Sequence, residues 1–102
     1  MPVINTKRGA ASTTPGQLVA LDASRTDLYV TNEDGAIIIR VGDSSVTGTG
    51  TPATCGLAIM PGQTLPIVSA TQGGANPAAQ EWWIVSDSGT PAYSVLEYGD
   101  FS

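Results

Sequence analysis

Groups able to perform acid–base or nucleophilic chemistry are scarce in this chain. There is no histidine, and the single cysteine, Cys55, stands between Thr54 and Gly56. A catalytic cysteine needs a basic partner that lowers its thiol pKa, so we interpret Cys55 as a small, semi-buried apolar residue. A serine nucleophile would need Lys7 or a carboxylate as its base, and the nine acidic residues, apart from the adjacent Glu33 and Asp34, stand singly at turns and strand ends. We therefore expect a protein that is not an enzyme.

Oxygen ligands and glycine-rich loops are present but lack the spacing of a binding motif. Asn32, Asp34 and Asp43 could suggest a calcium site, yet the repeated acidic spacing of a calcium loop is absent. Asp34 is explained by turn formation alone, because aspartate bonds its own backbone. Gly48-Thr49-Gly50 has no following Lys-Ser/Thr and no helix, so it is not a phosphate loop. We expect no metal and no cofactor.

Trp82 and Trp83 are the residues most typical of a binding surface. Adjacent side chains of a strand point to opposite faces, so both indoles cannot enter one core. We predict that Glu81–Ser86 and Ala92–Tyr98 form a hairpin with one indole on each face. One face is the core, and the other is covered by a loop, by the N-terminal segment or by a partner, since exposed tryptophan and tyrosine often anchor interfaces. The sequence leaves these alternatives open.

The elements that would position these residues are strands. A hairpin is predicted between Thr26–Glu33 and Ala36–Val41, because the Asp-Gly pair between them favours a two-residue turn with positive φ at both positions. Alternation then places one apolar set on a single face: Leu28, Val30, Ile37, Ile39 and Val41. Tyr29 and Arg40 would oppose one another on the other face, as a cation–π pair or as part of a partner surface.

Proline and glycine indicate where the remaining turns and strand edges lie. Residues 1–15 lack periodicity and are interpreted as an extended N-terminal arm, and residues 16–102 as a single β-sandwich domain. A turn is predicted at Pro61-Gly62, where proline presets φ and glycine supplies a positive value. Pro66 cannot donate to a ladder, so its strand, Gln63–Val68, is expected at a sheet edge or a bulge. No segment has a sustained helical period.

The fold class predicted is all-β: an antiparallel, jelly-roll-like β-sandwich of six to eight short strands with the extended arm. The net charge is −5, and the four basic residues form no stripe that would neutralise phosphates. We expect no nucleic-acid partner and no membrane partner, because no apolar run approaches the length of a bilayer. No secretory signal is recognised, so synthesis in a cytosol is expected.

Four segments together resemble small virion proteins of tailed bacteriophages. In that group a Leu-x-Val-Thr-Asn strand leads to an Ile-x-Val-Gly-like strand, then to an apolar Pro-Gly segment and a final strand that ends near glutamate. The corresponding segments here are Ala23–Asn32, Ile39–Asp43, Gly56–Gln63 and Val95–Tyr98. The resemblance covers about residues 16–98.

The resemblance implies a jelly-roll-like sandwich similar to capsid decoration or cement proteins, which bind the outer capsid surface and stabilise the head by bridging capsid subunits. The implied location is the virion, after synthesis in the host cytoplasm. The partners we expect are the major capsid protein and further copies of this chain, as a dimer or trimer. The interface residues that we predict from their chemistry and placement are Lys7, Arg8, Tyr29, Arg40, Pro66, Trp82 and Trp83.

Two alternatives use the same features differently. Trp82, Trp83 and Tyr29 could stack against sugar rings in a carbohydrate- or receptor-binding module of a phage fibre or tail. A head–tail connector component is the other alternative. Copy number per particle separates the three, because decoration requires hundreds, a connector about a dozen and a fibre a few to some tens.

Overall fold

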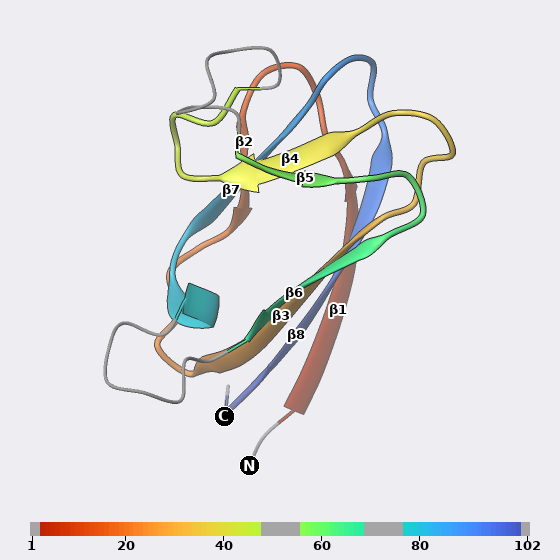
Figure 1. Ribbon diagram of the computed structural model, residues 1–102. Coiled ribbons are helices and arrows are strands. Elements are labelled where there is room, and N and C mark those ends of the chain that lie inside the picture. Colours follow the sequence, from red (N-terminus) through yellow and green to blue (C-terminus); the bar gives the residue numbers. More distant parts are fainter. Residues whose placement is uncertain (1–2, 48–55, 69–76, 101–102) are drawn as a thin grey trace.

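The computed structural model describes residues 3–47, 56–68 and 77–100, and these form two packed antiparallel sheets (Figure 1). The first, here called the β8 sheet, has the order β1 (Val3–Ala10), β8 (Ala92–Gly99), β3 (Arg25–Asn32) and β6 (Thr64–Val68). The second, the β7 sheet, has the order β2 (Gly16–Val19), β7 (Trp82–Ser86), β4 (Ile39–Gly42) and β5 (Leu57–Ile59). A short 3₁₀ helix, η1 (Pro77–Ala79), precedes β7. The prediction of an all-β antiparallel sandwich is confirmed.

The strand order is that of one long ribbon of paired strands, which forms when the chain folds back on itself. The chain turns back between β4 and β5, so that β4 pairs with β5, β3 with β6, β2 with β7 and β1 with β8. Two further pairings, β3 with β8 and β4 with β7, roll this ribbon into two sheets. Except for β4 and β5, consecutive strands therefore lie in opposite sheets.

The core lies between the sheets and is built by period-two alternation. Its buried members come from both sheets and from the connections: Ala11, Leu18, Val19, Leu28, Val30, Ile39, Val41, Ile59, Ile67, Ala78, Ile84 and Val95. Leu65, Trp82 and Tyr93 pack against this cluster from its margin. Burial of each large aliphatic side chain contributes about 1.5–3 kcal/mol, so alternating strands on two facing sheets drive this fold.

The predicted hairpin between Thr26–Glu33 and Ala36–Val41 is wrong, although four members of its apolar face, Leu28, Val30, Ile39 and Val41, lie in the core and only Ile37 does not. β3 and β4 belong to different sheets and do not pair. The segment between them bends because the Asp34 carboxylate accepts hydrogen bonds from the backbone N–H groups of Ala36 and Ile37, each at 2.8 Å. Gly35 is absent from the positive-φ glycines of the described residues, so the Asp-Gly pair forms no two-residue hairpin turn.

Asn32 fastens this crossing from inside the core, where its side chain has no exposed surface. Its Nδ2 donates to the carbonyl oxygens of Ile37, at 2.8 Å, and of Ile59, at 2.9 Å. Its Oδ1 accepts from the N–H of Asp34 at 3.0 Å. One amide therefore links the end of β3, the crossing segment and β5.

The second predicted hairpin, Glu81–Ser86 with Ala92–Tyr98, is also wrong in its pairing. β7 and β8 lie in opposite sheets, and the connection between them contains Gly89 at a φ of 60°. Ile84 and Val95 are both buried in the shared core. The two strands face each other across the interior, which satisfies their alternation as well as a hairpin would.

The predicted arm is extended, but it is not separate from the domain. Val3–Ala10 forms β1 and pairs along its whole length with β8, from Val3 opposite Gly99 to Ala10 opposite Ala92. Ala11 then continues inward, donating its N–H to the Pro91 carbonyl at 2.9 Å. Backbone pairing overrides the weak local pattern on which the boundary at residue 15 was based.

Two predictions from proline are confirmed. β6, which carries Pro66, lies at the edge of the β8 sheet. At Pro61-Gly62 the chain turns with a φ of 78° at Gly62, and the N–H of Gln63 donates to the Met60 carbonyl at 3.0 Å.

Asn32→Ala is expected to lower the free energy of unfolding by roughly 3 kcal/mol, because two buried carbonyl groups and one N–H lose their partner. Urea denaturation measures this change. The matched control is Asn5→Ala on exposed β1, which should change stability by less than about 0.5 kcal/mol. Equal effects of the two substitutions would contradict the role assigned to Asn32.

Candidate functional site

The outer face of the β8 sheet carries a run of apolar side chains across all four strands. The register aligns Ile4, Tyr98, Asp27 and Val68 in one row. It aligns Thr6, Leu96, Tyr29 and Pro66 in the next row. We call the apolar members of these two rows the outer patch: Ile4, Tyr29, Pro66, Val68, Leu96 and Tyr98.

The outer patch has exposed margins and a partly covered centre. Ile4 is 62% exposed, Val68 49% and Tyr98 38%, while Tyr29 and Leu96 in the middle strands are half-buried by their neighbours. Isolated exposed apolar residues are ordinary, but a contiguous group on one sheet face is typical of an interaction surface.

A polar row borders the patch on one side. The register aligns Arg8, Ser94, Thr31 and Thr64 there. The hydroxyl groups of Thr31 and Thr64 are 2.7 Å apart and hydrogen-bonded. An apolar centre with a polar rim is the usual composition of a protein–protein interface.

Two of the predicted interface residues meet in this patch. Tyr29 and Pro66 are direct cross-strand neighbours between β3 and β6. Arg40, in contrast, lies on β4 in the other sheet, where its Nε donates to the Asp87 carboxylate at 3.0 Å. The predicted opposition of Tyr29 and Arg40 is therefore wrong, because it depended on the hairpin that does not form.

The two tryptophans separate as their adjacency predicts. Trp82 packs against the core, and its Nε1 donates to the Pro77 carbonyl at 2.9 Å. Trp83 is half-buried on the outer face of the β7 sheet, where its Nε1 donates to the Glu81 carboxylate at 2.7 Å. Gln17, which is opposite Trp83 in the register, donates from Nε2 to the same carboxylate at 2.8 Å.

Part of the outer face of the β7 sheet is covered by a loop. Gly42 is opposite Trp83, and a Cβ atom at Gly42 would lie 3.2 Å from Cγ2 of Val46. Val46 is buried there, outside the main core cluster. A loop was one of the covers that the sequence allowed for the outer tryptophan face. A loop residue, Val46, does cover the sheet beside Trp83.

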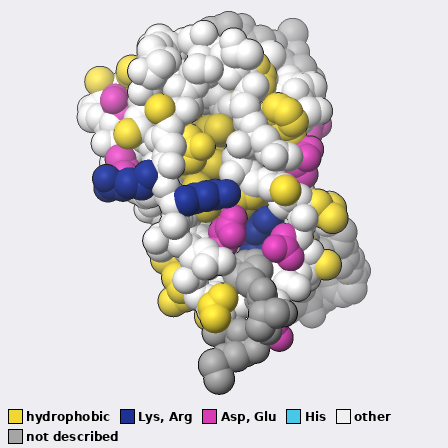
Figure 2. All heavy atoms as spheres, turned by 180° about the vertical axis from the view of Figure 1, so that it is seen from behind, with side chains coloured by type: hydrophobic (Ala, Val, Ile, Leu, Met, Phe, Trp, Pro, Cys, Tyr) yellow, Lys and Arg dark blue, Asp and Glu magenta, His cyan; other side chains and the backbone are white. Residues whose placement is uncertain are grey.

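Lys7 and Arg8 are engaged within the chain. The Lys7 ammonium lies 3.6 Å from the Glu97 carboxylate, and Arg8 forms a 2.9 Å ion pair with Glu33. In Figure 2 the basic side chains accordingly lie beside acidic ones on the face of the molecule shown. Both basic side chains remain largely exposed, so each pair contributes at most about 1 kcal/mol.

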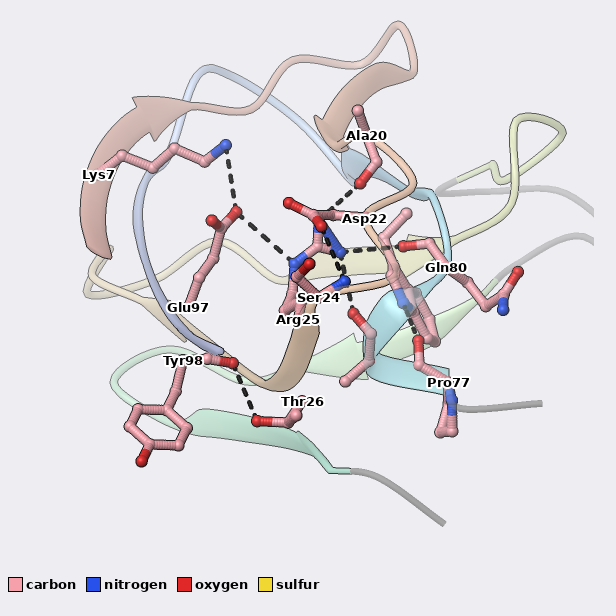
Figure 3. A network of polar contacts seen from close by, with 12 residues as sticks. Lys7, Ala20, Asp22, Ser24, Arg25, Thr26, Pro77, Gln80, Glu97 and Tyr98 are labelled. Atoms are coloured by element: carbon pink, nitrogen blue, oxygen red, sulfur yellow. Dashed lines mark hydrogen bonds and ion pairs between the residues drawn. The ribbon is translucent and has the colours of Figure 1, made fainter. Parts of the chain in front are cut away.

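Arg25 is a structural residue that sequence reasoning missed. Its side chain is nearly fully buried and donates to the carbonyl oxygens of Ala20, at 2.6 Å, Ala78, at 2.9 Å, and Gln80, at 3.3 Å. Its Nε lies 3.9 Å from the Glu97 carboxylate, which also faces Lys7 (Figure 3). The only sequence signal is an arginine that opens an otherwise apolar alternating strand.

Asp34 and Asp43 bond their own loops. The backbone N–H groups of Ala36 and Ile37 lower the pKa of Asp34, and the hydroxyl and N–H groups of Ser45 lower the pKa of Asp43. Among the described residues, no cluster of three or more acidic, histidine or cysteine side chains is arranged to hold a metal ion. Cys55 and Gly48-Thr49-Gly50 lie outside the described residues.

No family model, curated protein or solved structure matches this chain. In the described part of the chain, no helix has both the length and the apolar character needed to cross a membrane.

The local bonds at Asp34 predict a specific pH dependence. A carboxylate whose pKa is lowered by folding adds stability above its unfolded pKa, and this contribution is lost as the pH falls through the folded pKa. Asp34→Asn removes the titration, so the stability of the original protein relative to the variant should be constant above about pH 5 and should fall as the pH is lowered from there toward the depressed pKa of Asp34. Thermal unfolding across this range measures the difference, and a constant difference would contradict the assignment.

Proposed function

We propose that this protein is a bacteriophage capsid decoration protein. In this proposal it binds the outer surface of the assembled capsid, where the major capsid protein is its partner, and stabilises the head by bridging neighbouring subunits. The observation that carries the proposal is the outer patch, an apolar surface to which all four strands of one sheet contribute, with Asp27 and Thr6 as the polar members of its two rows. The resemblance of the strand segments to small virion proteins supports the same conclusion.

The form of the surface suits this role. The patch lies on strands that are fixed by ladders and by the core beneath them, so little conformational entropy is lost on docking. Its polar row can form the rim of an interface while the apolar rows are buried against the partner. The net charge of −5 favours solubility before assembly and gives no attraction to packaged DNA.

A second candidate function, carbohydrate binding by a phage fibre or tail, is supported by one arrangement. Trp83 is half-exposed, and Glu81 and Gln17 stand beside its ring on the same surface. An aromatic face with neighbouring carboxylate and amide groups is suited to stacking and bonding a sugar. Quenching or a shift of tryptophan fluorescence by host polysaccharide, lost in Trp83→Leu, would favour this function.

Phage heads assembled without the protein should lose DNA at lower temperature and at milder osmotic shock than complete heads, because the bridges between subunits are missing. Adding back purified protein should restore resistance and bind in hundreds of copies per head. Heads equally resistant with and without the protein would refute the decoration role, and a copy number near a dozen would indicate a connector.

Val68→Lys tests the patch itself. A lysine in the apolar interface must be desolvated on docking, so we expect binding to purified heads to weaken by about tenfold or more. Co-sedimentation with heads lacking the protein measures this. Leu21→Lys is the matched control, since Leu21 is also an exposed aliphatic side chain, 66% exposed, but lies outside the patch. Equal binding by the two variants would exclude the outer patch as the docking surface.

A further inference from the structure

The four sheet edges formed by the described residues differ in how they are protected against pairing with another chain. β6 carries Pro66, β2 has four residues and a register shift, and β5 has three residues. Proline, bulges, short length and charged side chains, lysine above all, are the devices by which edge strands avoid association. β1 has eight residues, no proline and an unbroken register with β8. It is the one long edge of the four without a proline or a bulge, and its two charged residues, Lys7 and Arg8, are held in ion pairs with Glu97 and Glu33 of the same chain.

The residues of β1 are also unusually exposed to solvent. Every residue of β1 except Gly9 is exposed, although the strand is fully paired with β8. In an edge strand alternate N–H and C=O groups point away from the sheet and remain available to a further strand. Figure 1 shows β1 at the margin of its sheet, with β8 and β3 on one side of it.

We propose that β1 pairs antiparallel with β1 of a second copy, across a two-fold axis that passes near Thr6. This joins the two β8 sheets into one continuous sheet of eight strands. The proposal concerns the free protein in solution and does not rest on the proposed function.

Self-complementarity of the strand favours a second copy as the occupant. A two-fold axis perpendicular to the sheet pairs outer-face residues with outer-face residues, and therefore even positions with even positions. When Thr6 faces Thr6 of the partner subunit, Ile4 faces Arg8 of the partner subunit. The first methylene groups of the arginine then lie beside the exposed isoleucine, while its guanidinium group stays paired with Glu33 of its own chain.

Charge excludes the neighbouring register that is shifted toward the C-terminal end of β1. If the axis passed through Lys7, the lysines of the two copies would lie directly opposite one another, which is destabilising. With the axis at Thr6, Lys7 faces Asn5 of the partner subunit, and the ion pairs of Lys7 with Glu97 and of Arg8 with Glu33 are kept. No like charges meet along residues 3–9.

The dimer would place two outer patches on the same face of one extended sheet. Ile4 and Tyr98 lie at the β1 side of the patch, so they would stand closest to the axis. A partner with repeating subunits would then meet two linked sites, which raises avidity without any new contact.

Thr6→Cys in a Cys55→Ser background tests the register. Residues directly opposite in an antiparallel pair are about 4.5–5.5 Å apart between Cα atoms, a separation that a disulfide can span. We expect mild oxidation to convert most of the protein into a covalent dimer, whereas the control Thr13→Cys, on an exposed loop residue, stays mainly monomeric. Equal and low cross-linking of both variants would overturn the proposal.

Thr6→Lys tests the association without a covalent trap. Two ammonium groups face each other at the axis, so the dissociation constant of the dimer should rise by about tenfold or more, with Thr13→Lys as control. Sedimentation equilibrium measures both, and circular dichroism confirms that the variants fold. If the protein sediments as a monomer at concentrations up to about 0.5 mM, the dimer is refuted, whatever the result of the capsid-binding experiments.

Discussion

Burial of β3 against β4 across the interior is the interaction on which the rest of this sandwich depends. Leu28 and Val30 from one sheet and Ile39 and Val41 from the other have no exposed surface and belong to one cluster. Facing sheets pack about 10 Å apart, so the chain between these strands must cross that gap. The amide of Asn32 and the carboxylate of Asp34 bond the crossing backbone, which would otherwise bury polar groups without partners. β6 and β8 then flank β3, and β5 and β7 flank β4.

One end of the sandwich depends on a buried cation. Arg25 binds three carbonyl groups from two different connections and lies near the carboxylate of Glu97 on β8. A buried charge is tolerated only when it is well bonded, and the fork of the guanidinium group meets several backbone acceptors at once. The side chain thereby joins the segment before β3 to η1. The residues of η1 are small and offer little apolar area for packing.

The two outer faces differ in how far they are covered. On the β7 sheet, Val46 from the following loop covers Gly42, and Trp83 is bonded to Glu81. On the β8 sheet the apolar patch is left without a cover among the described residues, with ion pairs and hydroxyl groups at its border. The exposed β1 edge adjoins that same patch. Docking to a capsid through the face and association through the edge would therefore use neighbouring but separable surfaces.

The sequence by itself determined the fold class, most of the inward set of side chains and the edge position of the Pro66 strand, because alternation, turn formers and a missing donor act over a few residues. It also separated Trp82 from Trp83, since neighbours on a strand must face opposite ways. Only the tertiary structure decided which strands pair. Alternation is satisfied equally when two runs lie side by side in one sheet and when they face each other across a core, so the two predicted hairpins failed. For the same reason, only two members of the outer patch, Tyr29 and Pro66, were predicted from the sequence. The other members come from strands that are distant in the sequence, and only the register of the sheet brings them together.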